Sequence, residues 1–305
     1  MVTDLGWYAM PAVRALILLA LMLLWGTATA AFLVVRAGVE AHPVIAGWLR
    51  RLPGLFAWFL LTLSLCRGAL QVLAFSDPGM PADPDLARAV LTTGSWGAGW
   101  ITQTLVAFVL LALSWRLRDS PVALRWTVVI AATALLLAQA GMGHGADPFW
   151  SPAIAGRMVH FTHLLGAGTW IGTLAVLSLA VFPSLRGEDR RAAMVAVLDR
   201  FSLLARTGAA LIVASGGLAL LVYTNSLREL FTAPWGRLVL AKIALTGLVA
   251  VAGYLNWKVN TPRIAGGAPD GSQRLRRAVV IELALAMALI VVTGILVGLG
   301  TPRDS

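Results

Sequence analysis

Long apolar blocks separated by short polar segments dominate the chain. Eight blocks are long enough to cross a bilayer, because about 20 residues of helix span a hydrocarbon layer roughly 30 Å thick. These predicted spans lie at about 15–35, 53–75, 96–115, 121–141, 158–182, 201–223, 235–257 and 278–299. The alternating polarity that is typical of membrane β-strands is not found. The pattern therefore predicts an all-α integral membrane protein, a bundle of eight transmembrane helices that forms a single domain over residues 1–305.

The composition supports this interpretation. The chain is 59% hydrophobic and 12% charged, whereas about a quarter of the residues in soluble domains are charged. The net charge of +10 does not call for a nucleic-acid partner, because Lys and Arg mark the cytoplasmic loops of membrane proteins. The single cysteine, Cys66, lies inside the second predicted span, so the sequence offers neither an internal disulfide nor a CxxC motif.

The basic residues are distributed unevenly between the two sets of loops. Sixteen lie in or beside the connections at 36–52, 116–120, 183–200 and 258–277, and six lie in or beside the opposite set, which includes both termini. The positive-inside rule then predicts periplasmic termini for a multi-pass protein of the bacterial inner membrane. We expect residues 1–30 to be retained rather than cleaved as a signal peptide, because cleavage would leave the basic 36–52 segment outside.

Three of the four histidines gather near the outer ends of the fourth and fifth predicted spans. His160 and His163 are three residues apart, so they project from the same face of a helix. Met142 and His144 end the preceding span and are expected at the same level, because only a short loop joins the two helices. The fourth histidine, His42, belongs to an inner loop and is expected to be a solvated side chain.

Imidazole and thioether groups together favour copper over other metals. Thioethers select Cu+, and imidazole binds copper as Cu+ or Cu2+, whereas calcium and magnesium require oxygen ligands and finger-type zinc sites require cysteines. His144, His160, His163 and Met142 are therefore the predicted metal ligands. Two alternatives stay open. Such residues also occur as hydrogen-bonded or gap-filling side chains, and two of the same histidines could hold a haem b between opposite faces.

Some charged residues lie within the predicted spans, where ionisable groups are expensive and usually paired or functional. Arg67 and Lys242 fall in the outer half of the membrane, and Glu282 falls near the inner surface. We expect Glu282 to meet basic residues at the inner helix ends, such as Arg206 or Arg263.

The two outer-half cations need acceptors at their own depth. Arg67 could meet Gln71, Gln103 or helix-end carbonyls. Arg67 and Lys242 either stabilise the fold by extending their charged ends towards the interface or neutralise negative charge on a bound group, such as the propionates of a haem.

The later half of the chain resembles the copper-resistance protein D family of bacterial inner-membrane proteins. The resemblance is strongest over 143–305, and the first 140 residues match only in hydropathy. It rests on "GHGAD" at 143–147, "HLLGAGTWIGTL" at 163–174, "RFSLLARTGAALIVASGG" at 200–217, "TAPWGRLVLAKIAL" at 232–245 with Asn256, and "LRRAVVIELALAMALIVVTGIL" at 275–296.

This resemblance implies copper uptake from the periplasm into the cytoplasm, with a periplasmic copper-binding protein of the copper-resistance C type as donor. The histidines of the family pattern map onto His144 and His163, and His160 is less typical of it. Its later Arg, Lys and Glu map onto Arg237, Lys242 and Glu282.

Other functions remain as alternatives to copper transport. One is a b-type membrane cytochrome, and another is an assembly subunit that presents copper to a partner without transporting it. An enzyme is not expected, because the sequence shows neither a nucleophile–base pair nor a carboxylate pair. The sequence also lacks the GxxxxGK[ST] motif of a nucleotide-driven pump.

Overall fold

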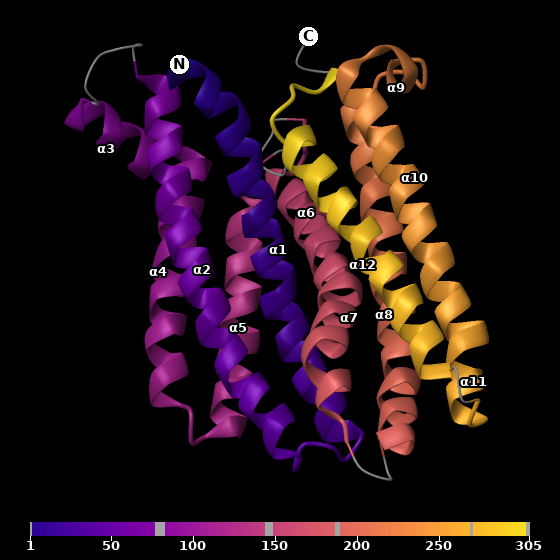
Figure 1. Cartoon of the computed structure of the whole chain (residues 1–305). Coiled ribbons are helices and arrows are strands. Elements are labelled where there is room, and N and C mark those ends of the chain that lie inside the picture. Colours follow the sequence, from indigo (N-terminus) through magenta and orange to yellow (C-terminus); the bar gives the residue numbers. More distant parts are fainter. Residues whose placement is uncertain (1, 77–82, 144–148, 187–189, 269–270, 303–305) are drawn as a thin grey trace.

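The computed structural model describes residues 2–76, 83–143, 149–186, 190–268 and 271–302. Within them, every regular element is a helix (Figure 1). Eight helices are long and apolar enough to span a membrane, as the hydropathy pattern predicts. They cover Ala9–Arg36, Pro43–Phe75, Gly94–Arg116, Pro121–Ala140, Ile154–Ser184, Arg190–Tyr223, Pro234–Ala265 and Gln273–Leu296.

The first four spans belong to α1 (Val2–Arg36), α2 (Pro43–Phe75), α4 (Gly94–Arg116) and α5 (Pro121–Ala140). The fifth consists of α6 (Ala153–Ala167), the π-helical η2 (Gly168–Gly172), α7 (Thr173–Val176), the π-helical η3 (Leu177–Val181) and the short η4 (Phe182–Ser184). The last three are α8 (Arg190–Tyr223), α10 (Pro234–Leu255) continued by η5 (Asn256–Asn260) and α11 (Thr261–Ala265), and α12 (Gly271–Leu296). The short α3 (Pro84–Thr92) and α9 (Glu229–Thr232) lie in connections.

Several helices extend beyond their predicted apolar blocks. α8 begins at Arg190 rather than near 201, and α2 begins at Pro43 rather than 53. Hydropathy marks only the part of a helix that suits lipid, whereas polar turns can continue the same helix into the interface. Pro43 suits the first helical turn, where its missing N–H has no partner to lose.

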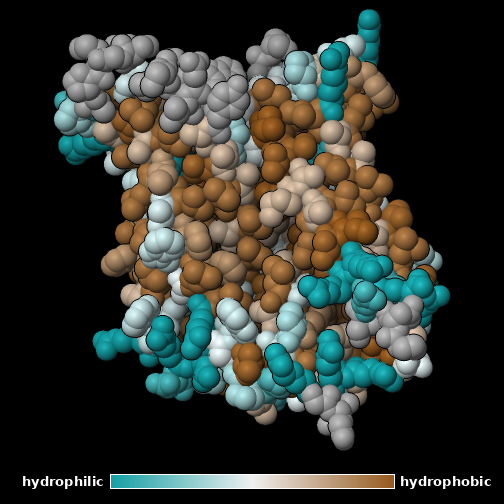
Figure 2. All heavy atoms as spheres, viewed as in Figure 1, coloured by the Kyte–Doolittle hydropathy of each residue, from teal (hydrophilic) through white to brown (hydrophobic). Residues whose placement is uncertain are grey.

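α1 lies at the centre of the bundle. It packs against α2 and α5 on one side and against η2, α7 and α12 on the other, so it joins the first four spans to the last four. Both termini lie at the same end of the molecule, together with α3 and α9 (Figure 1). We refer to this end as the outer end, in keeping with the predicted topology. On the face drawn in Figure 2, apolar side chains cover the middle of the bundle, and hydrophilic side chains gather at the end opposite the termini.

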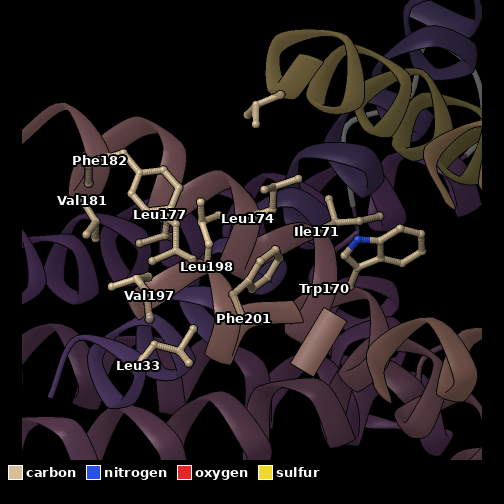
Figure 3. Packing of buried hydrophobic residues seen from close by; sticks show 14 of the residues in the cluster. Leu33, Trp170, Ile171, Leu174, Leu177, Val181, Phe182, Val197, Leu198 and Phe201 are labelled. Carbon is tan, nitrogen blue, oxygen red and sulfur yellow. The ribbon is translucent and has the colours of Figure 1, made fainter. Parts of the chain in front are cut away.

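The largest buried cluster surrounds the fifth span. Trp170, Ile171, Leu174 and Leu177 of this span pack with Phe201 and its neighbours on α8 (Figure 3). Two π-helical turns interrupt the regular helix of this span, and the first of them begins five residues after His163. A π turn takes in an extra residue and so changes which face the following side chains occupy, and such turns are frequent at functional sites.

Candidate functional site

His163 faces α8 and contacts a short stretch of small residues there. Its Nδ1 lies 3.0 Å from Ser215 Oγ, and a Cβ added to Gly216 would lie 3.4 Å from the ring. Ser215 Oγ donates its hydrogen to the backbone oxygen of Leu211 at 2.5 Å. With its hydrogen on this backbone oxygen the hydroxyl accepts from the imidazole, an arrangement with the ring hydrogen on Nδ1 and the lone pair on Nε2.

His160 lies one turn closer to the outer end and faces the same helix. Its Nε2 is 3.2 Å from the Tyr223 hydroxyl, which also accepts a hydrogen bond from Trp150 Nε1 at 2.7 Å. Tyr223 and Trp150 are both buried, and they pack with Trp235 at the outer end of α10. The two histidines thus share one helix face, as predicted, and each meets a hydroxyl group of α8.

Met142 is buried on the other side of this region. Its side chain lies against Gly99 of α4, because a Cβ added to that glycine would collide with the methionine Cγ and approach its sulfur. The structure thus places Met142 beside α4 and the two histidines beside α8. His144 lies outside the described residues. Within the described parts of the chain no group of three His, Cys, Asp or Glu side chains forms a ready-made metal site.

Lys242 belongs to α10 and lies close enough to His163 for its charge to act on the imidazole. No carboxylate among the described residues pairs with this ammonium group. A cation beside a predicted copper ligand opposes binding of a second cation, so Lys242 weakens any copper site that uses His163.

Arg67 is 3% exposed and belongs to the first half of the bundle. Its guanidinium donates to Gln139 Oε1 at 3.1 Å and lies 5.8 Å from the Trp96 ring. Its partner is therefore on α5 and is neither Gln71 nor Gln103, two of the acceptors that the sequence offered. Arg67 and Lys242 meet different helices, so the structure does not bring them together on one bound group.

Glu282 has different partners from those predicted. It lies five residues, or about 7.5 Å, along α12 from Arg277 of the basic inner segment. The carboxylate accepts a hydrogen bond from Asn256 Nδ2 at 2.8 Å and another from the Trp170 side chain. The expected pairing with Arg206 or Arg263 is wrong, because the carboxylate accepts its hydrogen bonds from neutral donors on two other helices.

Sequence reasoning missed the neutral residues that hold these charged and aromatic groups. Ser215 and Tyr223 carry no signal of their own, since hydroxyl groups within helices commonly bond to their own backbone. Asn256 was noted only as part of the resemblance. Asn260, four residues further along the helix, donates a hydrogen bond to Asn256 at 2.7 Å. Residues four apart share a helix face, so this pair of amides was the sequence signal that could have indicated a polar site in the inner half.

Comparison with known proteins identifies relatives of both halves of the chain. The family model described as Copper resistance protein D matches residues 195–296, and that described as Copper resistance protein D-like, N-terminal domain, matches residues 2–148. The second match corrects the expectation that the first 140 residues agree in hydropathy alone. The single domain over 1–305 stays a prediction.

One curated relative is the copper transport protein CutJ of Bacillus subtilis (strain 168), which is 28% identical over 231 residues. The alignment covers 74% of this chain and 41% of CutJ, so the chain spans about two fifths of the length of that relative. No solved structure matches the chain.

Proposed function

Since the chain belongs to the copper resistance protein D family, we propose that it carries copper across the bacterial inner membrane, from the periplasm towards the cytoplasm. Copper is the transported substrate, and the last four spans are its route. A periplasmic copper-binding protein of the copper-resistance C type delivers it to the outer end. The similarity to a copper transport protein supports this proposal.

The observation that carries the proposal is the environment of His163. Metal-binding histidines usually donate their second ring N–H to a neighbouring acceptor, which fixes the ring and its tautomer. The Nδ1 contact with Ser215 has this form and leaves Nε2 as the coordinating atom. We assign the same role to His160, whose ring must part from Tyr223 to bind through Nε2.

Met142 and His144 complete the proposed ligand set. Met142 supplies a thioether that favours Cu+, and it must turn from α4 towards the fifth span to do so. His144 follows it by two residues in the chain. The proposal thus requires a rearrangement at the outer ends of α5 and α6 on copper loading.

Copper analysis of the purified protein tests the ligand assignment. We expect wild type, loaded with Cu+ in detergent and desalted, to retain copper and His163→Ala to lose most of it. His42→Ala is the matched control, because His42 precedes α2 at the opposite end of the bundle. Equal copper occupancy in all three proteins would exclude His163 as a ligand.

Two further measurements separate the alternatives. A Soret band in the purified protein that disappears in His163→Ala would support a b-type cytochrome instead of a copper carrier. Copper uptake into proteoliposomes tests transport itself. Protein that binds copper through His163 but moves none across the bilayer would be a copper-presenting subunit.

A further inference from the structure

A cavity of about 250 Å3 lies in the inner half of the last four spans. Its walls come from the fifth span, α8, α10 with its η5 and α11 extension, and α12. Most of the lining is apolar or aromatic, including Trp170, Phe201, Tyr254 and Trp257. Small-molecule sites in proteins have this character, with apolar walls and a few placed polar groups.

The cavity has a side entrance between α8 and α10. Among the described residues, α10 packs mainly on α12, whereas α8 packs on α6 and η2 and meets the α10 segment chiefly through α11 at the inner end. Tyr254, at the cavity edge, is 56% exposed, and Ala250 beside it is also exposed. In a bilayer this entrance faces lipid rather than water.

The polar end of the cavity is Glu282, which is 2% exposed. Asn256 and Trp170 donate to its carboxylate. Gly253 contributes no side chain here, and a Cβ at that position would lie 3.1 Å from Glu282 Oε1. The glycine therefore leaves one face of the carboxylate open.

No cation among the described residues neutralises Glu282. Arg206 lines the same cavity, but its Nε donates to the Ser202 backbone oxygen and its guanidinium lies 4.8 Å from the Trp257 ring. A buried carboxylate without a cationic partner is strongly unfavourable. A hydrogen-bond donor on a bound molecule, or a shared proton, would relieve it.

We propose that this cavity binds a membrane-dissolved quinol. The ring lies among the aromatic side chains, one hydroxyl donates to Glu282, and the isoprenoid tail leaves between α8 and α10. The volume suits one substituted ring. The phosphate of a phospholipid headgroup is an anion, which the Glu282 carboxylate repels, and an acyl chain offers the carboxylate no donor. The proposal does not depend on copper transport.

Binding of a short-chain quinol tests this site. The full chain is reconstituted in nanodiscs of synthetic phosphatidylcholine and titrated with decylubiquinol, with quenching of tryptophan fluorescence as the readout, since Trp170 and Trp257 line the cavity. We expect saturable quenching, and about tenfold weaker binding by Glu282→Gln, because a hydrogen bond to a charged group is stronger than one to a neutral group.

A second variant tests the entrance without touching the carboxylate. Ala250→Phe narrows the entrance and should abolish saturable quenching, whereas Val251→Phe, its neighbour on α10, is 57% exposed in wild type, does not line the cavity and should bind normally. Monodisperse elution of each variant checks its folding. Absence of saturable binding to wild type, wild-type affinity in both Glu282→Gln and Ala250→Phe, or equal quenching by 1-decanol would each overturn the proposal.

Discussion

The contact between Ser215 and His163 gives the sharpest test of the proposed copper site. Ser215→Ala removes the hydroxyl 3.0 Å from Nδ1 and leaves the imidazole itself in place. The ring then loses a hydroxyl partner that helps to fix its tautomer and orientation. A buried group that loses its hydrogen-bond partner costs about 1–3 kcal/mol, and loss of an outer-shell partner lowers metal affinity about 10–100-fold. The two ranges agree, so we expect a copper Kd about 10–100-fold higher than that of wild type.

Competition with a Cu+ chelator of known affinity measures this change. Ser202→Ala is the matched control, because Ser202 lies on the same helix and also donates to the backbone oxygen four residues earlier, but does not contact a histidine. We expect Ser202→Ala to keep the wild-type Kd. Equal affinities for Ser215→Ala and wild type, in protein that His163→Ala strips of copper, would refute the reasoning about the tautomer.

Two other substitutions probe the surroundings of this site. Lys242→Met removes the charge that acts on His163. Repulsion between two such cations is on the order of 1–4 kcal/mol, so we expect copper to bind at least about fivefold more tightly in the same competition. Lys258→Met, at the inner end, should leave the copper Kd unchanged. Gly208→Ala places a Cβ 2.7 Å from the Gly166 oxygen and 3.0 Å from the Trp170 Cβ, so crowding of about 1–3 kcal/mol should lower the thermal midpoint in detergent. Gly217→Ala meets no atom within 4 Å, and equal midpoints for the two glycine variants would contradict the close crossing of α6 and α8.

The membrane architecture could be predicted from local sequence. A helix that faces lipid must satisfy its own backbone groups, so an apolar block of sufficient length leaves few alternatives. For this reason the eight spans were found in the right places, and only their ends were missed. The π-helical turns at 168–172 and 177–181 were not foreseen, because no local signal separates them from an ordinary apolar helix.

The polar sites were only partly predictable. Spacing along one helix correctly placed His160 and His163 on a shared face, because the α-helical repeat fixes it. Partners from other helices were harder to foresee. Glu282 was assigned to basic residues at the membrane surface, but its carboxylate meets Asn256 and Trp170, because helix packing brings those donors to its depth.

The sequence by itself determined that this chain is an eight-helix membrane protein with both termini on one side and a histidine pair near the outer end of the fifth span. Each of these features depends on residues close together in the chain. Tertiary structure alone decided that Ser215 orients His163, that Met142 faces α4, and that α8 and α10 leave a cavity beside Glu282. A single sequence displays its hydrophobic pattern directly. In lipid, however, helix–helix contacts depend on close packing and a few hydrogen bonds rather than on that pattern.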